Sequence, residues 1–160
     1  MTTAYLSFEL KSRPTGRVFR DLLAAGLDYC SVFGFVIQED NKYLPPRPHE
    51  IVERLESHLL SRTWVTEWPN SKAFYGYRVR QYLFEHSPAL VETVMDIEED
   101  LYAWVNPSLP DDPHLLRSDG STWFASTTTE EVSWFDLSSS ELETIRQDWP
   151  TLAEELVPID

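Results

Sequence analysis

The sequence predicts an α+β fold: a mixed sheet of about six strands with an N-terminal βαβ crossover, a C-terminal β-meander and about four packed helices. Three observations support this prediction. Some short segments alternate apolar and polar residues, and others are wholly apolar. Longer segments carry apolar residues at helical spacing. Turn residues separate these segments. At 160 residues the chain has the size of one ordinary domain, and we expect a single domain over 1–160.

The N-terminal segments predict the crossover. Leu6, Phe8 and Leu10 alternate with polar neighbours, which indicates a strand with one buried face. Apolar residues recur at helical spacing over 18–30. The run VFGFVI at 32–37 has no polar alternation, which is typical of a central strand covered on both faces. Two strands joined by a helix of this length favour a parallel, right-handed connection.

The middle of the chain combines a linker, a helix and two strands. Three prolines within 45–48 predict a stiff, extended connection. Apolar positions over 51–60 then predict a second helix. Segments 64–68 and 74–84 are expected to be strands on either side of a turn at 69–72, because Pro, Asn and Ser favour turns.

The C-terminal elements are marked by caps and a tight turn. Ser87 and Pro88 are typical of a helix start, and we expect a third helix with Leu90, Val94, Leu101 and Trp104 buried. The SDG turn at 118–120 predicts a hairpin, which a strand at 132–137 extends into a meander. The capping box SSSE at 138–141 starts a fourth helix.

Charge is distributed unevenly along the chain. Residues 1–80 carry 11 Lys and Arg against 9 Asp and Glu, whereas residues 81–160 carry 2 against 18, and the formal net charge is −14. Such an excess repels polyanions and speeds encounters with basic surfaces. We therefore expect neither nucleic acid nor an anionic membrane as the ligand.

The acids of the C-terminal half are the predicted partner-binding residues. They cluster at the third helix and in the segments after it, with few basic residues between them. No Lys or Arg within that helix offsets the like-charge spacing of Glu92, Asp96 and Asp100. The predicted set is Glu92, Asp96, Glu98, Glu99, Asp100, Asp111, Asp112, Glu130 and Glu131.

The chain contains no complete catalytic, metal or cofactor motif, so we predict no enzyme activity, no cofactor and no metal site. His49 and Glu53 form only part of a metalloprotease motif. Asp111, Asp112 and His114 supply an incomplete ligand set. The single cysteine, Cys30, is expected to be a buried, inert thiol, and the remaining histidines, at 58 and 86, are expected at the surface.

The N-terminal residues lack a basic leader and an apolar stretch of signal-peptide length, which predicts a cytoplasmic protein. Aromatic residues are frequent, at 13%. Most of them are expected in the core, but Trp64, Trp68, Tyr75 and Tyr77 are also candidates for a ligand site.

Four segments carry a resemblance to other proteins: WPNS at 68–71, LYAW at 101–104, LPDD at 109–112 and LRSDGSTWFAS at 116–126. Together they resemble a group of uncharacterised small acidic bacterial proteins, some of which bear a sporulation-protein label. Members usually continue the hairpin with a His-Glu pair, where this chain has Thr129 and Glu130. The resemblance implies a bacterial cytoplasmic protein and no particular activity.

Two functional hypotheses follow. The first is an acidic protein-binding module, an immunity protein or antitoxin that neutralises a basic partner such as a nuclease toxin. The alternative is a regulatory or scaffold module that binds a protein or small ligand through the aromatic residues of 64–77. An enzyme that uses Asp111, Asp112 and His114 ranks third. The sequence does not indicate the oligomeric state.

Overall fold

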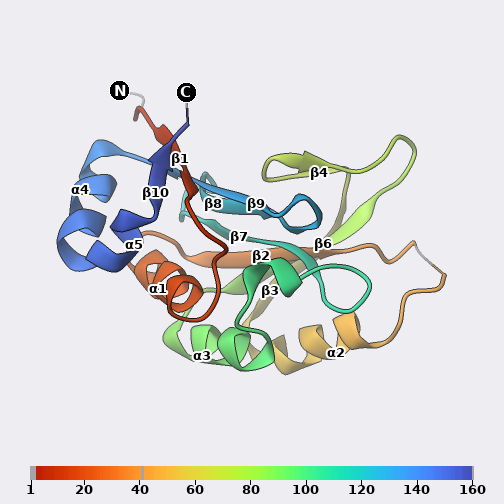
Figure 1. Ribbon diagram of the computed structural model, residues 1–160. Helices are drawn as coiled ribbons and strands as arrows, with labels where there is room; N and C mark the ends of the chain where they lie inside the picture. Colours follow the sequence, from red (N-terminus) through yellow and green to blue (C-terminus); the bar gives the residue numbers. More distant parts are fainter. Residues whose placement is uncertain (1–2, 41, 160) are drawn as a thin grey trace.

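One antiparallel sheet organises the molecule (Figure 1). The computed structural model describes residues 3–40 and 42–159, and within them eight strands pair in the order β10-β1-β9-β8-β7-β2-β6-β3, while β4 and β5 form a separate two-stranded hairpin. The strands are β1 Leu6–Leu10, β2 Val32–Ile37, β3 Leu59–Val65, β4 Glu67–Trp68, β5 Ser71–Lys72, β6 Val79–Glu85, β7 Asp111–Leu116, β8 Thr122–Thr127, β9 Val132–Leu137 and β10 Leu156–Pro158. The α-helices are α1 Arg17–Ala25, α2 Arg47–Arg54, α3 Pro88–Ile97, α4 Ser139–Asp148 and α5 Pro150–Glu154, with 3₁₀ turns η1 Gly26–Asp28, η2 Glu56–His58, η3 Leu101–Ala103 and η4 Thr128–Glu130.

The α+β class is confirmed, but the predicted sheet was too small, the predicted mixed sheet is wrong because the described sheet is antiparallel, and the described chain has five α-helices where about four were expected. Every neighbouring pair is antiparallel, and the described sheet has eight strands where about six were expected. β1 and β2 do run parallel to each other, because four antiparallel steps separate them, but β9, β8 and β7 lie between them. Those three strands form the predicted C-terminal meander.

The helices α1, α2 and α3 lie along one side of the sheet in Figure 1 and cover its apolar face. Phe35 of β2 packs against Trp104, with ring centroids 6.2 Å apart. Most of the predicted core residues are buried, including Phe33, Phe35, Ile37, Leu90, Val94, Leu101 and Trp104, but Leu6 of β1 is 55% exposed although it was expected on a buried face. One apolar cluster includes residues from both halves of the chain, so the two halves share a core.

Several element boundaries differ from the sequence prediction. The second helix was expected to extend to residue 60, but α2 ends at Arg54, and Leu59 already belongs to β3. The expected strand over 74–84 begins only at Val79. The extended linker is shorter than predicted, because Pro48 already lies in the first turn of α2. Pairing with β6 explains the early start of β3, since strand partners override local helical spacing.

The third helix begins as predicted and ends early. The Ser87 hydroxyl accepts a hydrogen bond from the Leu90 backbone N–H, while the predicted capping box of Ser138 and Glu141 starts α4. α3 ends at Ile97, so Asp100 is not on the same helix as Asp96, and the expected like-charge pair between them does not form. Asp100 instead caps η3, where its carboxylate accepts from the Tyr102 backbone N–H.

A glycine in the middle of β2 accommodates a buried histidine of β7. The two residues, Gly34 and His114, pair in register, and the His114 side chain is buried. A Cβ at position 34 would lie 2.4 Å from His114 Nε2 and 2.8 Å from Leu83 Cδ2, closer than atoms tolerate. Close packing around the imidazole therefore requires glycine at this position.

We expect Gly34→Ala to lower the free energy of unfolding by about 1–3 kcal/mol, because the added methyl overpacks the sheet. Urea denaturation followed by tryptophan fluorescence measures the change. In a His114→Ala background the same substitution should cost less, because its nearest clash is gone. An equal cost in both backgrounds would contradict the assignment of the clash to His114.

Candidate functional site

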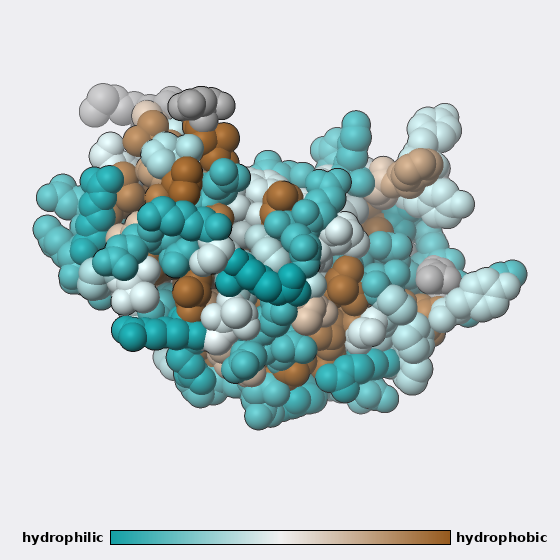
Figure 2. Space-filling view, viewed as in Figure 1, coloured by the Kyte–Doolittle hydropathy of each residue, from teal (hydrophilic) through white to brown (hydrophobic). Residues whose placement is uncertain are grey.

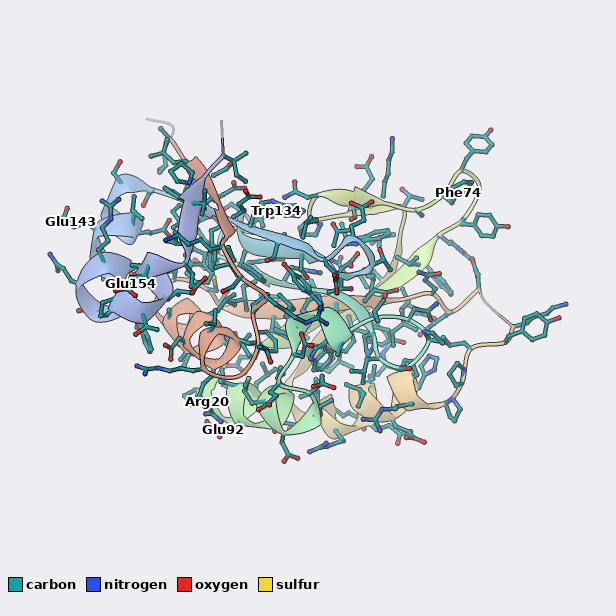
Figure 3. The ribbon with its side chains drawn as sticks, in the orientation of Figure 1. Arg20, Phe74, Glu92, Trp134, Glu143 and Glu154 are labelled. Carbon is teal, nitrogen blue, oxygen red and sulfur yellow. The ribbon has the colours of Figure 1, made fainter. Side chains whose placement is uncertain are left out.

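Four of the predicted partner-binding acids form ion pairs within the molecule. Arg20 Nη1 lies 2.5 Å from Glu92 Oε1, and the two residues are close together in Figure 3. Arg54 Nη2 lies 2.8 Å from Asp96 Oδ2. Asp100 and Glu131 share a third arginine, Arg13. These arginines all come from the N-terminal half, so each of these four carboxylates has a cation beside it.

The other predicted acids lie in different environments. Glu98 accepts a hydrogen bond from the Asp100 backbone N–H, and Glu99 is exposed. Glu130 is exposed at the edge of a cleft. Asp111 and Asp112, in contrast, are 3% and 5% exposed. Both lie below the surface, although the sequence placed them in the partner-binding set.

The cleft beside Glu130 has a volume of about 1160 Å³. Its walls come from the loop after β2, from residues 67–78, which we call the arm, and from the segments around β7 and η4. The arm projects from the body next to β6 in Figure 1, and Figure 2 shows apolar colour on it above a mostly hydrophilic surface. The lining includes Gln38, Asp40, Tyr43, Glu67, Trp68, Phe74, Tyr77, Asp111, Asp112 and Glu130.

Exposed aromatic side chains surround the opening of this cleft. Tyr43, Phe74 and Tyr77 line it with 80%, 85% and 62% exposure, and Tyr75 on the same loop is 98% exposed. Figure 3 shows Phe74 at the outer end of the arm. Large aromatic residues usually bury most of their surface, so four of them exposed together indicate a contact surface.

The tryptophans of this region are less exposed than the tyrosines. Trp64 is half-buried, and the guanidinium carbons of Arg78 and Arg80 each lie 4.4 Å from its ring centroid. Trp68 is half-buried and donates its indole N–H to Asp112 Oδ2 at 2.9 Å. The sequence groups both with Tyr75 and Tyr77, but the structure gives the tryptophans structural contacts and leaves the tyrosines exposed.

Asp112 fastens the arm to the sheet. Its backbone adopts a positive φ of 57°, and its Oδ1 accepts from the Thr128 backbone N–H at 2.8 Å and from Thr128 Oγ1 at 3.1 Å. With Trp68 on Oδ2, three donors satisfy the buried carboxylate. A contact of 3.2 Å between Ser71 Oγ and Thr127 Oγ1 adds a second link between arm and sheet.

Asp111 is held next to Asp112 by different partners. Its Oδ1 accepts from the Asn106 backbone N–H at 2.6 Å, and its Oδ2 from Gln38 Nε2 at 3.0 Å. Burial, with a smaller contribution from the charge of Asp112, raises the pKa of Asp111 to about 6. Burial also raises the pKa of Asp112. Raised carboxyl pKa values in a cleft are typical of functional sites.

The histidines are placed for structural contacts. His114 Nδ1 donates to the Asp112 carbonyl at 2.8 Å, and its Nε2 lies 3.1 Å from Gln81 Nε2, so both ring nitrogens are engaged. Burial lowers the pKa of His114 to about 4. His86 was expected at the surface but is 7% exposed, and its Nε2 donates to the Leu23 carbonyl. Its neighbours in sequence carry no sign of that long-range contact.

The two partial metal motifs do not assemble. His49 Nε2 lies 2.8 Å from Glu39 Oε1 instead of joining Glu53. Within residues 3–40 and 42–159, no three His, Cys, Asp or Glu side chains are grouped so that they could hold a metal ion. Cys30 is buried, as predicted, and burial raises its pKa.

Part of the site does not follow from the sequence. Tyr43, Phe74 and Gln38 line the cleft without having been singled out. One local signal existed: AFYGY at 73–77 places three aromatics around a glycine without strand alternation, which favours a loop with exposed rings. The two buried carboxylates were hidden, because acids before a strand usually lie in solvent.

Comparison with known proteins adds no relative. No protein-family model, curated protein or solved structure matches the chain. The resemblance to small acidic bacterial proteins therefore stays a prediction. Among the described helices, none has both the length and the apolar character that crossing a membrane requires.

We expect the stability of the Asp111→Asn variant, measured against the wild type, to increase as the pH rises. The carboxyl titrates at about pH 6 in the folded chain against an ordinary value of 3.8, so the folded state loses stability between these values as the proton leaves. The difference in unfolding free energy between variant and wild type should shift by about 2.5 kcal/mol in favour of the variant between pH 4 and pH 7.

Urea denaturation at four pH values across this range measures the shift. Contributions from His114 and His86 cancel in the difference, because both proteins carry them. Asp148→Asn, an exposed change of the same charge on α4, is the control and should give no comparable trend. A difference for Asp111→Asn that does not change with pH would contradict the assignment.

Proposed function

We propose that this protein is a binding module for a basic protein partner, in the manner of an immunity protein or antitoxin, and that the cleft with the arm forms its binding surface. The observation that carries the proposal is the group of exposed aromatic side chains at one opening: Tyr43, Phe74, Tyr75 and Tyr77. Tyrosine and phenylalanine are enriched in protein interfaces, where they dominate the binding energy.

Charge supports a basic partner. The net charge of −14 attracts cationic surfaces over a distance of about 8 Å at physiological salt. The carboxylates of α3 contribute less to specific contacts than their number suggests, since Glu92 and Asp96 already face Arg20 and Arg54. In this proposal the whole charge speeds the encounter, and the aromatic rim of the cleft provides the contacts.

A second candidate is a module that binds a small ligand in the same cleft. The volume of about 1160 Å³ leaves room for it, because it slightly exceeds the range of about 300–1000 Å³ that small-molecule sites usually occupy. The openness of the aromatic rim to solvent favours a protein instead, since drug-sized ligands are largely enclosed. Neither candidate requires catalysis by Asp111, Asp112 and His114.

We expect the triple variant Phe74→Ala, Tyr75→Ala and Tyr77→Ala to lose the partner. If each ring contributes 1–2 kcal/mol at the interface, affinity should fall by at least about 100-fold, mainly through faster dissociation. The unfolding midpoint should hardly change, because the three side chains are exposed. The partner is first isolated by affinity capture and identified by mass spectrometry, and surface plasmon resonance then gives both rate constants.

A matched control separates the two predicted surfaces. Glu92→Gln with Asp96→Asn neutralises the exposed acids of α3 without touching the cleft, and should change only the association rate modestly. If this double variant abolishes binding while the aromatic triple variant binds normally, the binding surface is α3, and the proposal fails. If the purified protein carries a bound small metabolite and captures no protein partner, the result supports the second candidate instead.

A further inference from the structure

The cleft holds three carboxylates that have no counter-ion. Asp40, Glu67 and Glu130 all line it and are all exposed. The side chain of none of them forms a hydrogen bond or ion pair with another described residue. They differ in this respect from the exposed acids Glu92 and Asp96 of α3, each of which faces an arginine.

The cations of the cleft do not fill this gap. The Lys42 ammonium lies 5.1 Å from the centroid of the Tyr43 ring, and Arg78 lies over Trp64. Lys72 lies opposite Glu67 in the β4–β5 pair, but no ion pair joins their described side chains. Together with the buried Asp111 and Asp112, the lining contains five acidic and three basic residues. The cleft therefore has a net negative charge and favours a cationic ligand.

The surrounding rings suit a planar cation. Phe74 and Tyr77 line the cleft and are more than half exposed, so their faces are available to a ligand. A guanidinium group stacks on aromatic rings and binds carboxylates through two parallel hydrogen bonds, which a lysine ammonium cannot do. The same chemistry already occurs beside the cleft, where Arg78 and Arg80 lie on Trp64.

We propose that the cleft is an arginine-recognition site: a guanidinium presented by the partner stacks on Phe74 or Tyr77 and faces the carboxylates of Asp40, Glu67 and Glu130. This inference rests on the proposed function, because it names the group with which a basic protein enters the cleft. It excludes an anionic ligand for the same cleft, since five acids would repel it.

The test titrates ¹⁵N-labelled protein with N-acetyl-arginine methylamide and records backbone and indole N–H signals. We expect saturable, millimolar binding that shifts the Trp68 indole signal and amides of the arm. The matched control ligand is N-acetyl-citrulline methylamide, which has nearly the same shape without the charge, and it should bind at least about tenfold more weakly. The lysine analogue should lie between the two.

Two triple variants separate local from overall charge. Asp40→Asn, Glu67→Gln and Glu130→Gln should abolish saturation by the arginine probe. Glu143→Gln, Asp148→Asn and Glu154→Gln remove the same charge from α4 and α5, away from the cleft (Figure 3), and should leave the affinity nearly unchanged. All six residues are exposed, so both variants should fold. Circular dichroism confirms this before the titration.

The outcomes distinguish this inference from the proposed function. Equal binding of the arginine and citrulline probes, or equal loss in both triple variants, overturns the arginine site. If the Phe74→Ala, Tyr75→Ala and Tyr77→Ala variant nevertheless fails to bind the captured partner, the proposed function stands although the arginine site is excluded. If the arginine probe binds as expected but the aromatic variant keeps the partner, the arginine site stands and the partner surface lies elsewhere.

Discussion

The buried carboxylate of Asp112 is the interaction on which the candidate site depends. Burying a charge in a protein is costly unless donors surround it. Asp112 meets that condition through Trp68 on one oxygen and Thr128 on the other, so the arm, β7 and η4 meet at a single side chain. The sheet provides the floor of the cleft, but the arm that forms its wall is fixed by this carboxylate and by the contact of Ser71 with Thr127.

The uneven charge of the sequence has a partly internal explanation. Arginines of the first half face acids of the second half: Arg20 faces Glu92 and Arg54 faces Asp96, while Arg117 within the second half binds Glu141 at a buried position. Exposed pairs of this kind contribute only about 0–1 kcal/mol each to stability. Their effect on recognition is local, since they neutralise Glu92 and Asp96, whereas the side chains of Asp40, Glu67 and Glu130 in the cleft have no such ion pair among the described residues.

The sequence predicted the elements that depend on local pattern. Alternation at Leu6, Phe8 and Leu10, the caps at Ser87 and Ser138, and the turn at 118–120 all lie where the structure has them. It did not predict which strands are neighbours, because three strands inserted between β1 and β2 leave no trace in either segment. β10 escaped notice since three residues are too few for a pattern.

The candidate site was harder to predict than the fold because its parts are each ordinary in isolation. Asp111 and Asp112 resemble solvated loop acids in the sequence, but the fold buries Asp111 beside Gln38 and Asp112 beside Trp68, and this burial raises their pKa values. Phe74 and Tyr77 resemble core residues until the absence of a strand over 73–78 leaves them exposed. A binding surface in this molecule therefore arises from a contrast: the acids of the cleft floor are covered, and the aromatic residues of its rim are not.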